Sequence, residues 1–134
     1  MERVAGYRLV GIHDGVRPFA SENLIRKLFE TAETYPAVVP VVPVTDTLKV
    51  LDSDLNEIPG AAADRSVLYG AQTPQVFHTN VLCEAYRQPF DTTFTDDASV
   101  VGRHGTPIRY IPGEKYNIKI TTPEDLVLAR SFLL

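Results

Sequence analysis

The sequence predicts an α/β fold in which helices cover a layered sheet. Short runs of β-branched and apolar residues alternate with segments whose apolar residues recur every three to four positions. The segments read strand, helix, strand, arm, two helices, two strands and a final helix, an order typical of layered α/β proteins. The 134 residues, 44% of them hydrophobic, suffice for one domain with a buried core.

The first strand and the first helix are predicted from residues 9–36. Leu9–His13 is an apolar run of strand length. Ser21 is a candidate N-cap for the helix that follows. That helix places four apolar residues on one face, namely Leu24, Ile25, Leu28 and Phe29. Pro36 ends the helix because its ring cannot continue the backbone hydrogen bonding.

A second strand and an arm are predicted next. Ala37–Val44 is rich in valine, and it is too short and too broken by proline for a helix. Its two prolines indicate an edge strand or a bent strand. Residues 45–66 contain two weakly apolar segments around the polar turn Asp52–Asp54. This pattern predicts an arm outside the compact core, over approximately residues 45–66.

Three helices and two strands complete the predicted fold. One helix is predicted from the spacing of Val76, Phe77, Val81, Leu82 and Tyr86. A short helix follows, capped by Thr95 or Asp96. Residues 107–113 and 117–121 are predicted as strands, and the last helix begins after the cap Thr122.

Composition excludes several classes of function. The formal net charge of −4 and the absence of any Lys/Arg run argue against a nucleic-acid partner. Cys83 is the only cysteine, so there is no disulfide framework and no Cys-x-x-Cys metal site. No apolar stretch approaches the roughly 20 residues that span a bilayer. The start of the sequence lacks the apolar region of a signal peptide. These features predict a cytoplasmic protein without a membrane partner.

Asp14 and Arg17 are the first candidate site residues. They follow the strand Leu9–His13, at the strand end where open α/β sheets bind ligands. Asp14 can hold a metal ion or a hydroxyl group, and Arg17 can bind a phosphate through its planar fork. The alternative is an ion pair that only shapes the turn. His13 is interpreted as a packing or turn residue because no nucleophile accompanies it.

Further candidates are spread along the chain. Lys119 lies in the otherwise apolar segment 117–121, where it either serves phosphates or protects a strand edge. Thr47 and Arg65 lie at the two ends of the arm, and a solvated turn is the simpler interpretation of both. Thr73 precedes a proline and is a candidate helix cap.

Phosphate loops and metal clusters are not evident. The sequence contains neither G-x-G-x-x-G nor G-x-x-x-x-G-K-[ST], so it lacks both common phosphate-binding loops. Asp96 and Asp97 are interpreted as a helix start, where negative charge suits the helix dipole. A two-carboxylate metal site is the weaker alternative because the sequence shows no third ligand.

Five motifs in a fixed order resemble one enzyme family. They are "HDGVRPF", "PVTDTLK", "DRSVLYGAQTPQVF", "FTDDASVV" and "NIKITTPEDLVLA", and the resemblance that they carry extends over about residues 9–133. The chain resembles the C-terminal part of the 2-C-methyl-D-erythritol 4-phosphate cytidylyltransferases of the non-mevalonate isoprenoid pathway. The family that makes CDP-ribitol shares most of these motifs, so a ribitol-5-phosphate cytidylyltransferase remains an alternative.

The resemblance implies a fold, a reaction and partners. The implied fold is a Rossmann-like three-layer α/β/α sheet of the nucleotidyltransferase (nucleotide-diphospho-sugar transferase-like) type, with a projecting β-arm. The implied reaction transfers CMP from CTP to the sugar-alcohol phosphate and releases pyrophosphate, with Mg²⁺ as cofactor. The implied assembly is a homodimer in which each arm helps to form the substrate site of the other subunit.

The resemblance also implies roles for residues. It points to six substrate-binding residues, namely Asp14, Arg17, Thr47, Arg65, Thr73 and Lys119. Arg65 and Lys119 are the implied catalytic residues, because the reaction needs positive charge where negative charge builds up on phosphorus. Thr47 and Arg65 would hold the substrate phosphate of the partner subunit, with assistance from Thr73. Asp14 is a candidate metal ligand, and the complete ligand set is not implied.

One family feature has no counterpart in these residues. In the family, a Gly-rich loop with Arg and Lys wraps the CTP triphosphate ahead of the first motif, and no such loop occurs here. The resemblance therefore leads us to expect that residues 1–134 are the C-terminal portion of a single cytidylyltransferase domain, truncated at the N-terminus and inactive by themselves. A non-catalytic α/β dimerisation fragment is the alternative from another class.

Overall fold

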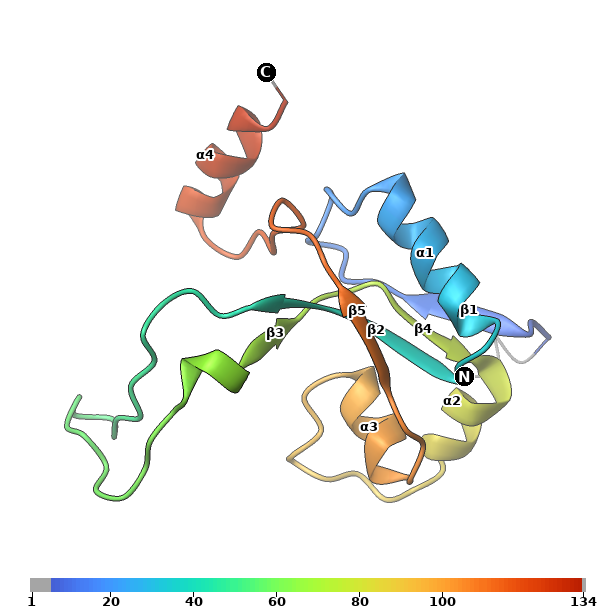
Figure 1. Ribbon diagram of the computed structural model, residues 1–134, viewed down its shortest axis with the longest axis horizontal. Coiled ribbons are helices and arrows are strands. Elements are labelled where there is room, and N and C mark those ends of the chain that lie inside the picture. Colours follow the sequence, from blue (N-terminus) through green and yellow to red (C-terminus); the bar gives the residue numbers. More distant parts are fainter. Residues whose placement is uncertain (1–5, 134) are drawn as a thin grey trace.

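Five strands form one mixed sheet. The computed structural model describes residues 6–133 and is drawn in Figure 1. The strands are β1 (Leu9–Ile12), β2 (Ala37–Pro43), β3 (Tyr69–Ala71), β4 (Gln75–His78) and β5 (Arg109–Pro112). They are ordered β1-β4-β2-β3, and β5 pairs with β2. Among the strands of residues 6–133, only the β2–β5 pair is parallel.

Strand β2 lies inside the sheet, so the edge strand, one of the two alternatives that its prolines indicated, is wrong. Its first residues pair with β4, and its last residues pair with β3. Pro40 falls between these two ladders, where the Gln72 N–H donates to the Pro40 carbonyl at 2.8 Å. Pro40 has no N–H to return, and the Gln72 carbonyl accepts from Nε2 of Gln75 at 3.3 Å instead. A side-chain amide thus replaces the ladder bond that proline cannot make.

Helices cover both faces of the sheet, as the predicted α/β class requires. On one face, α1 (Glu22–Ala32) packs its buried Leu24 and Leu28 against β2 and β4. On the other face lie α2 (Thr79–Ala85) and α3 (Asp97–Arg103). Figure 1 shows these helices on opposite sides of the strands. The Ser21 cap is confirmed, while Ile25 is 38% exposed and leaves the buried stripe.

The helix predicted to begin near Val76 begins three residues later. Val76 and Phe77 lie on β4, and both are fully buried. Val76 packs in the cluster under α1, whereas Phe77 packs in the cluster under α2 and α3. Adjacent strand residues point to opposite faces, and here both faces are covered. The resulting apolar run imitates a helical stripe in the sequence.

The C-terminal segment differs in part from its prediction. Residues 117–121 belong to no strand of the described sheet, so the strand predicted there is wrong. Helix α4 (Pro123–Ser131) begins after Thr122, as predicted. In Figure 1 it stands apart from the sheet, and of its residues only Ala129 is buried. Within residues 6–133, no helix is long and apolar enough to cross a membrane.

The predicted arm is present and projects from the sheet. Figure 1 shows the chain between β2 and β3 extending away from the helices. A short antiparallel contact joins Leu51 to Glu57 across the arm. The turn between them is held by Oδ1 of Asp52, which accepts from the Asp54 and Asn56 N–H groups. A single 3₁₀ turn, Arg65–Val67, returns the chain to β3.

The start of α4 is expected to loosen in acid. The Asp125 carboxylate accepts from the Thr121 N–H, the Thr121 hydroxyl and the Thr122 N–H, each at 3.0 Å. The bonds from Thr121, followed by those from Thr122, hold the pKa of Asp125 below the ordinary 3.8. A lowered pKa stabilises the folded state above pH 3.8, and this stabilisation is lost as the pH falls through the folded value.

An NMR titration of the α4 amide groups measures this loss. The expected midpoint lies below 3.8, and the matched variant Asp125→Asn should remove the transition because its amide does not titrate. A midpoint at or above 3.8 for the Asp125 carboxylate would contradict the prediction.

Candidate functional site

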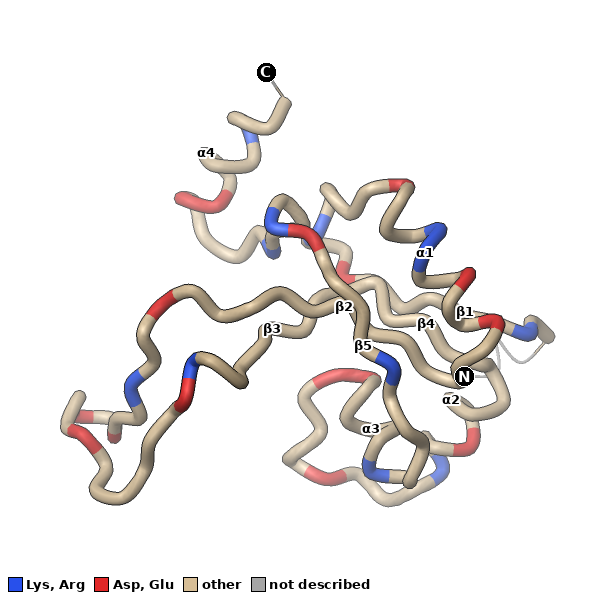
Figure 2. Tube along the Cα trace, in the orientation of Figure 1, with Lys and Arg blue, Asp and Glu red and all other residues tan. Residues whose placement is uncertain are grey.

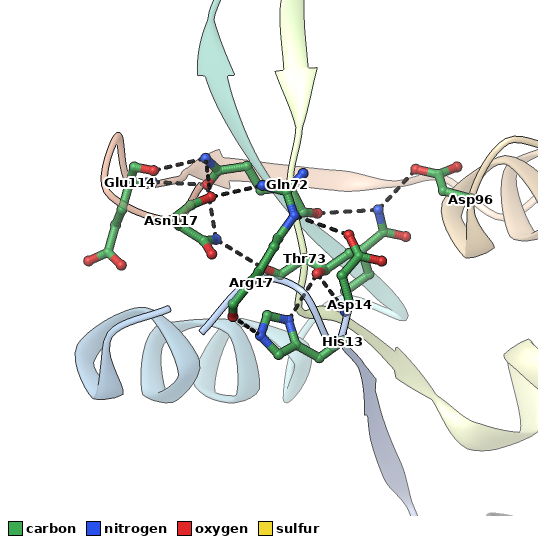
Figure 3. A network of polar contacts seen from close by, with 9 residues as sticks. His13, Asp14, Arg17, Gln72, Thr73, Asp96, Glu114 and Asn117 are labelled. Atoms are coloured by element: carbon green, nitrogen blue, oxygen red, sulfur yellow. Dashed lines mark hydrogen bonds and ion pairs between the residues drawn. The ribbon is translucent and has the colours of Figure 1, made fainter. Parts of the chain in front are cut away.

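Three loops meet beside the carboxyl end of β1. They are residues 13–17 after β1, residues 72–74 between β3 and β4, and residues 113–120 after β5. Figure 3 shows their polar side chains converging on one connected network. The hydrogen bonds that join these loops include pairs that are 42 and 100 positions apart in the chain. The site is therefore a product of the tertiary fold.

The Asp14–Arg17 pair stands at one side of this network. Nε of Arg17 donates to Oδ2 of Asp14 at 3.1 Å, and Nη1 donates to the Asn117 carbonyl at 2.8 Å. The Arg17 side chain is 13% exposed, against 37% for Asp14. Nη2 of Arg17 makes no hydrogen bond within residues 6–133, so its two N–H donors remain for a ligand. The ion pair shapes the turn and also leaves an anion-binding group in place.

Thr73 accepts from the Asp14 backbone, and His13 contacts Thr73 in turn. The Asp14 N–H donates to Oγ1 of Thr73 at 2.9 Å. Nε2 of His13 lies 2.8 Å from the Arg17 carbonyl, which can only accept, so in the neutral ring Nε2 carries the proton. Nδ1 is then the acceptor for the Thr73 hydroxyl, which lies 2.9 Å away. The hydroxyl of Thr73 is therefore engaged inside the network, and Thr73 precedes strand β4 and caps no helix.

Gln72 and Asn117 were not singled out in the sequence, yet they connect the three loops. Both are buried, at 6% and 0% exposure. Oε1 of Gln72 accepts from the Glu114 N–H and from Nδ2 of Asn117. Nε2 of Gln72 donates to the carbonyls of Glu114 and Asn117. Both residues lie inside motifs of the resemblance, but nothing in the sequence assigns them a role, because that role depends on contacts between distant segments.

Gly113 is required by the close approach of Gln72. A Cβ atom at position 113 would overlap Oε1 of Gln72 and lie 3.3 Å from the Val41 carbonyl oxygen. Gln72 cannot move aside without giving up the hydrogen bonds of its side-chain amide. We expect Gly113→Ala to lower the free energy of unfolding by about 1–3 kcal/mol through this overlap.

Chemical denaturation measures the loss at Gly113. Gly15 is the matched control, because nothing lies within 4 Å of a Cβ placed there. Equal stabilities of Gly113→Ala and Gly15→Ala would contradict the assigned contact.

Lys119 lies beside the Asp14–Arg17 loop. The residue two positions before it, Asn117, accepts from Arg17, and the Ile120 N–H donates to the Val16 carbonyl at 2.8 Å. Both hydrogen bonds tie the Lys119 segment to the loop after β1. Lys119 itself is exposed. The structure thus brings Asp14, Arg17 and Lys119 into one region.

Thr47 and Arg65 lie on the arm, away from this network. Nη1 of Arg65 donates to the Thr45 carbonyl at 2.9 Å and so bridges the two sides of the arm at its base. The neighbouring Asp64 accepts from the Ser66 hydroxyl and N–H, which lower the pKa of Asp64. Figure 2 shows that the arm carries charges of both signs. Within one chain, these two residues do not join the site.

Asp96 caps α3, as one of the two predicted caps. It forms a capping box with Ser99 and also accepts from Nε2 of Gln75 at 2.9 Å. The Asp97 carboxylate accepts from the Tyr86 hydroxyl. Burial is the main cause that raises the pKa of Tyr86, and the hydrogen bond to Asp97 raises it further. No group of three or more His, Cys, Asp or Glu side chains in the described chain is placed to hold a metal ion. The helix-start interpretation of Asp96 is confirmed.

Comparison with known proteins decides the family. The profile of the family described as "IspD: 2-C-methyl-D-erythritol 4-phosphate cytidylyltransferase" matches residues 1–134. The chain belongs to the IspD family. The resemblance inferred from the five motifs is confirmed by this match.

Relatives of the IspD chain carry the same description. The 2-C-methyl-D-erythritol 4-phosphate cytidylyltransferase of Syntrophus aciditrophicus (strain SB) is 43% identical over 127 residues, which cover 93% of this chain and 53% of that protein. The enzyme of the same description from Porphyromonas gingivalis (strain W83) is 47% identical over 126 residues, which cover 93% of this chain and 55% of the relative. The IspD chain thus spans about half the length of the curated relatives it matches.

Solved structures confirm the three-layer α/β fold of the IspD chain. The crystal structure of 2-C-methyl-D-erythritol 4-phosphate cytidylyltransferase from Thermus thermophilus matches with a TM-score of 0.85 at 37% identity. This match covers 97% of the IspD chain and 64% of the other chain. The enzyme from Francisella tularensis matches with a TM-score of 0.80 at 29% identity, over 92% of this chain and 58% of that one.

Proposed function

We propose that this chain provides the sugar-alcohol-phosphate site of a cytoplasmic cytidylyltransferase. The reaction transfers CMP from CTP to 2-C-methyl-D-erythritol 4-phosphate and releases pyrophosphate. The observation that carries the proposal is the Asp14–Arg17 pair, with the segment of the exposed Lys119 hydrogen-bonded to the same loop. Family membership supports the reaction, because the relatives with this fold bear the name of that activity.

Arg17 is the proposed phosphate-binding residue of the chain. Its guanidinium is anchored through Nε and Nη1, and Nη2 keeps two free N–H donors within the described residues. A planar guanidinium matches phosphate oxygens, and it stays charged at every physiological pH. The anchored cation therefore costs little reorganisation when an anion arrives.

Asp14 and Lys119 have complementary proposed roles. The Asp14 carboxylate is held in place by Arg17 and by its own N–H bond to Thr73, and it can accept from a hydroxyl of the sugar alcohol. Lys119 is an exposed ammonium on the adjoining segment, where it can neutralise charge near the reacting phosphates. Thr73 acts by orienting Asp14. Alignment of the two anionic reactants by such groups lowers the barrier to phosphoryl transfer.

The proposed assembly is a homodimer joined through the arm. Five apolar side chains of the arm are at least 36% exposed, namely Leu48, Val50, Leu51, Leu55 and Ile58. An apolar hollow of about 770 Å³ lies at the base of the arm, lined by Val67, Tyr69 and Tyr110 among others. Exposed apolar surface of this kind favours burial against a second protein surface. In the dimer, Thr47 and Arg65 would reach the substrate phosphate in the other subunit.

Magnesium fits the donor set as a cofactor shared with the nucleotide. Mg²⁺ is commonly bound by one or two carboxylates together with substrate phosphates. Asp14, with a side chain 37% exposed, is the residue of this cluster that can hold it. When bound, the ion supplies positive charge that stabilises the phosphate groups of the co-substrate CTP.

A binding titration tests the proposal on the chain itself. ¹H–¹⁵N NMR spectra are recorded while 2-C-methyl-D-erythritol 4-phosphate, ribitol 5-phosphate or inorganic phosphate is added. We expect the first ligand to shift the amide signals of residues 13–17 and 117–120 at the lowest concentration. Tighter binding of ribitol 5-phosphate would favour the ribitol enzyme instead. Binding no tighter than that of inorganic phosphate would contradict a sugar-alcohol-phosphate site.

A further inference from the structure

Asn117 is the most deeply buried polar residue of the described chain, with an exposure of 0%. Its Nδ2 donates to the Thr73 carbonyl at 2.9 Å and to Oε1 of Gln72 at 3.2 Å. Its Oδ1 is buried and has no hydrogen-bond partner in the described residues. An amide buried with one atom unsatisfied is costly for stability alone. The placement of this side chain therefore calls for a reason beyond packing.

The two groups that accept hydrogen bonds from the Arg17 guanidinium, here called its anchors, both depend on Asn117. The first anchor is the Asn117 carbonyl itself, which accepts from Nη1 of Arg17. The second anchor is the carboxylate of Asp14, which accepts from Nε of Arg17. The backbone N–H of Asp14 in turn donates to the Thr73 hydroxyl oxygen. The Thr73 carbonyl is in turn held by Nδ2 of Asn117. One residue thus touches the supports of both hydrogen bonds that orient the cation.

Gln72 locks Asn117 in this position. The Gln72 amide binds Asn117 twice, through Nδ2 and through the carbonyl that also receives Arg17. It also binds the backbone N–H and carbonyl of Glu114, which fixes the loop after β5. A guanidinium is rigid and planar, so the direction of the Asn117 carbonyl sets where the remaining donors of Arg17 point.

We propose that Asn117, locked by Gln72, is a positioning residue that orients the Arg17 guanidinium for phosphate binding. The inference deepens the proposed function and rests on it for the identity of the phosphate. Asn117 does not touch the ligand in this scheme. It acts through Arg17, and it ties the Lys119 segment to the same frame.

The first test observes Arg17 directly and needs no ligand. The Nε–H signal of Arg17 is assigned by ¹H–¹⁵N NMR in the chain without substitutions, in Asn117→Ala and in Val101→Ala. Val101 is fully buried in the core under α2 and α3 and serves as the matched loss of packing. We expect the signal to shift or exchange faster in Asn117→Ala and to be unchanged in Val101→Ala. An unchanged signal in a folded Asn117→Ala overturns the proposal.

The second test measures affinity for 2-C-methyl-D-erythritol 4-phosphate. Alanine keeps the main-chain carbonyl of residue 117 but loses the side-chain bonds that fix its direction. We therefore expect Asn117→Ala to weaken binding about tenfold, as if one hydrogen bond to a charged group were misaligned. In the Arg17→Ala background the same change should have no further effect, because Asn117 acts through Arg17. A full loss of about tenfold in that background would overturn the proposal.

Two further outcomes are distinguishable. If Asn117→Ala does not fold, Gln72→Met replaces it, since methionine is of similar size but cannot donate to the Asn117 carbonyl. The Arg17 Nε–H signal is then expected to shift in Gln72→Met. An unchanged signal in that variant counts against the proposal. If the unvaried chain does not bind the sugar-alcohol phosphate, the proposed function fails. The Arg17 signal still decides whether Asn117 positions the guanidinium.

Discussion

Arg17→Ala is expected to weaken binding of 2-C-methyl-D-erythritol 4-phosphate about a hundredfold, which corresponds to about 3 kcal/mol. The substitution removes the only guanidinium of the cluster and its two free Nη2 donors. It also leaves the Asp14 carboxylate and the Asn117 carbonyl without the N–H groups that they accept from. The uncompensated Asp14 charge would further repel the phosphate.

One variant separates the shape of the Arg17 side chain from its charge, and a second variant is the control. Arg17→Lys keeps the charge but loses the planar fork, so we expect an intermediate affinity. Arg26→Ala removes an exposed arginine on α1, whose 3.4 Å contact with Glu22 is unrelated to the cluster, and should bind as the unvaried chain does. Isothermal titration calorimetry at fixed ionic strength measures all three. Equal affinities of Arg17→Ala and Arg26→Ala would remove Arg17 from the site.

Phe77→Ala is expected to lower the free energy of unfolding by about 3–5 kcal/mol. Phe77 is fully buried on β4, where it packs under α2 and α3 with residues such as Leu82 and Val101. The substitution removes the largest fully buried side chain of the described residues. Small domains are stable by only about 5–15 kcal/mol, so most of the margin would be lost.

Urea denaturation followed by circular dichroism measures this loss, with Phe90→Ala as its control. Phe90 is 83% exposed, and its replacement should change the stability by no more than about 0.5 kcal/mol. A loss at Phe77 no larger than that at Phe90 would show that the core under α2 and α3 does not carry the fold.

Local signals explain which parts of the fold were predictable. The helices after Ser21, Asp96 and Thr122 begin where their caps predict, because a cap bonds to residues only three positions away. Strand β4 was missed because burial on both faces removes the alternation that marks a strand. Pro40 suggested an edge strand, and only the contact between Gln75 and Gln72 reveals why the sheet tolerates a proline inside it.

The candidate site was likewise predictable from the sequence only in part. Asp14 and Arg17 were found because charge directly follows an apolar strand, and Lys119 because it interrupts an apolar segment, while the substrate-binding role of Thr73 came from the resemblance. Asn117 and Gln72 lie inside the quoted motifs but were given no role, since the role of an uncharged amide in a loop depends on contacts that only the fold creates. The substrate-binding roles of Thr47 and Arg65 stay predictions, because a single chain holds the arm away from the cluster.

The span of the network has a consequence for folding kinetics. Asp14 meets Thr73 across 59 positions, and Arg17 meets Asn117 across 100. Closing such long loops costs entropy that only the assembled core repays, so contacts of this separation form late. A partly folded chain would hold its helices before it held its anion site. Occupancy by a phosphate ester would therefore report completion of folding, and added ligand would raise the melting temperature by mass action.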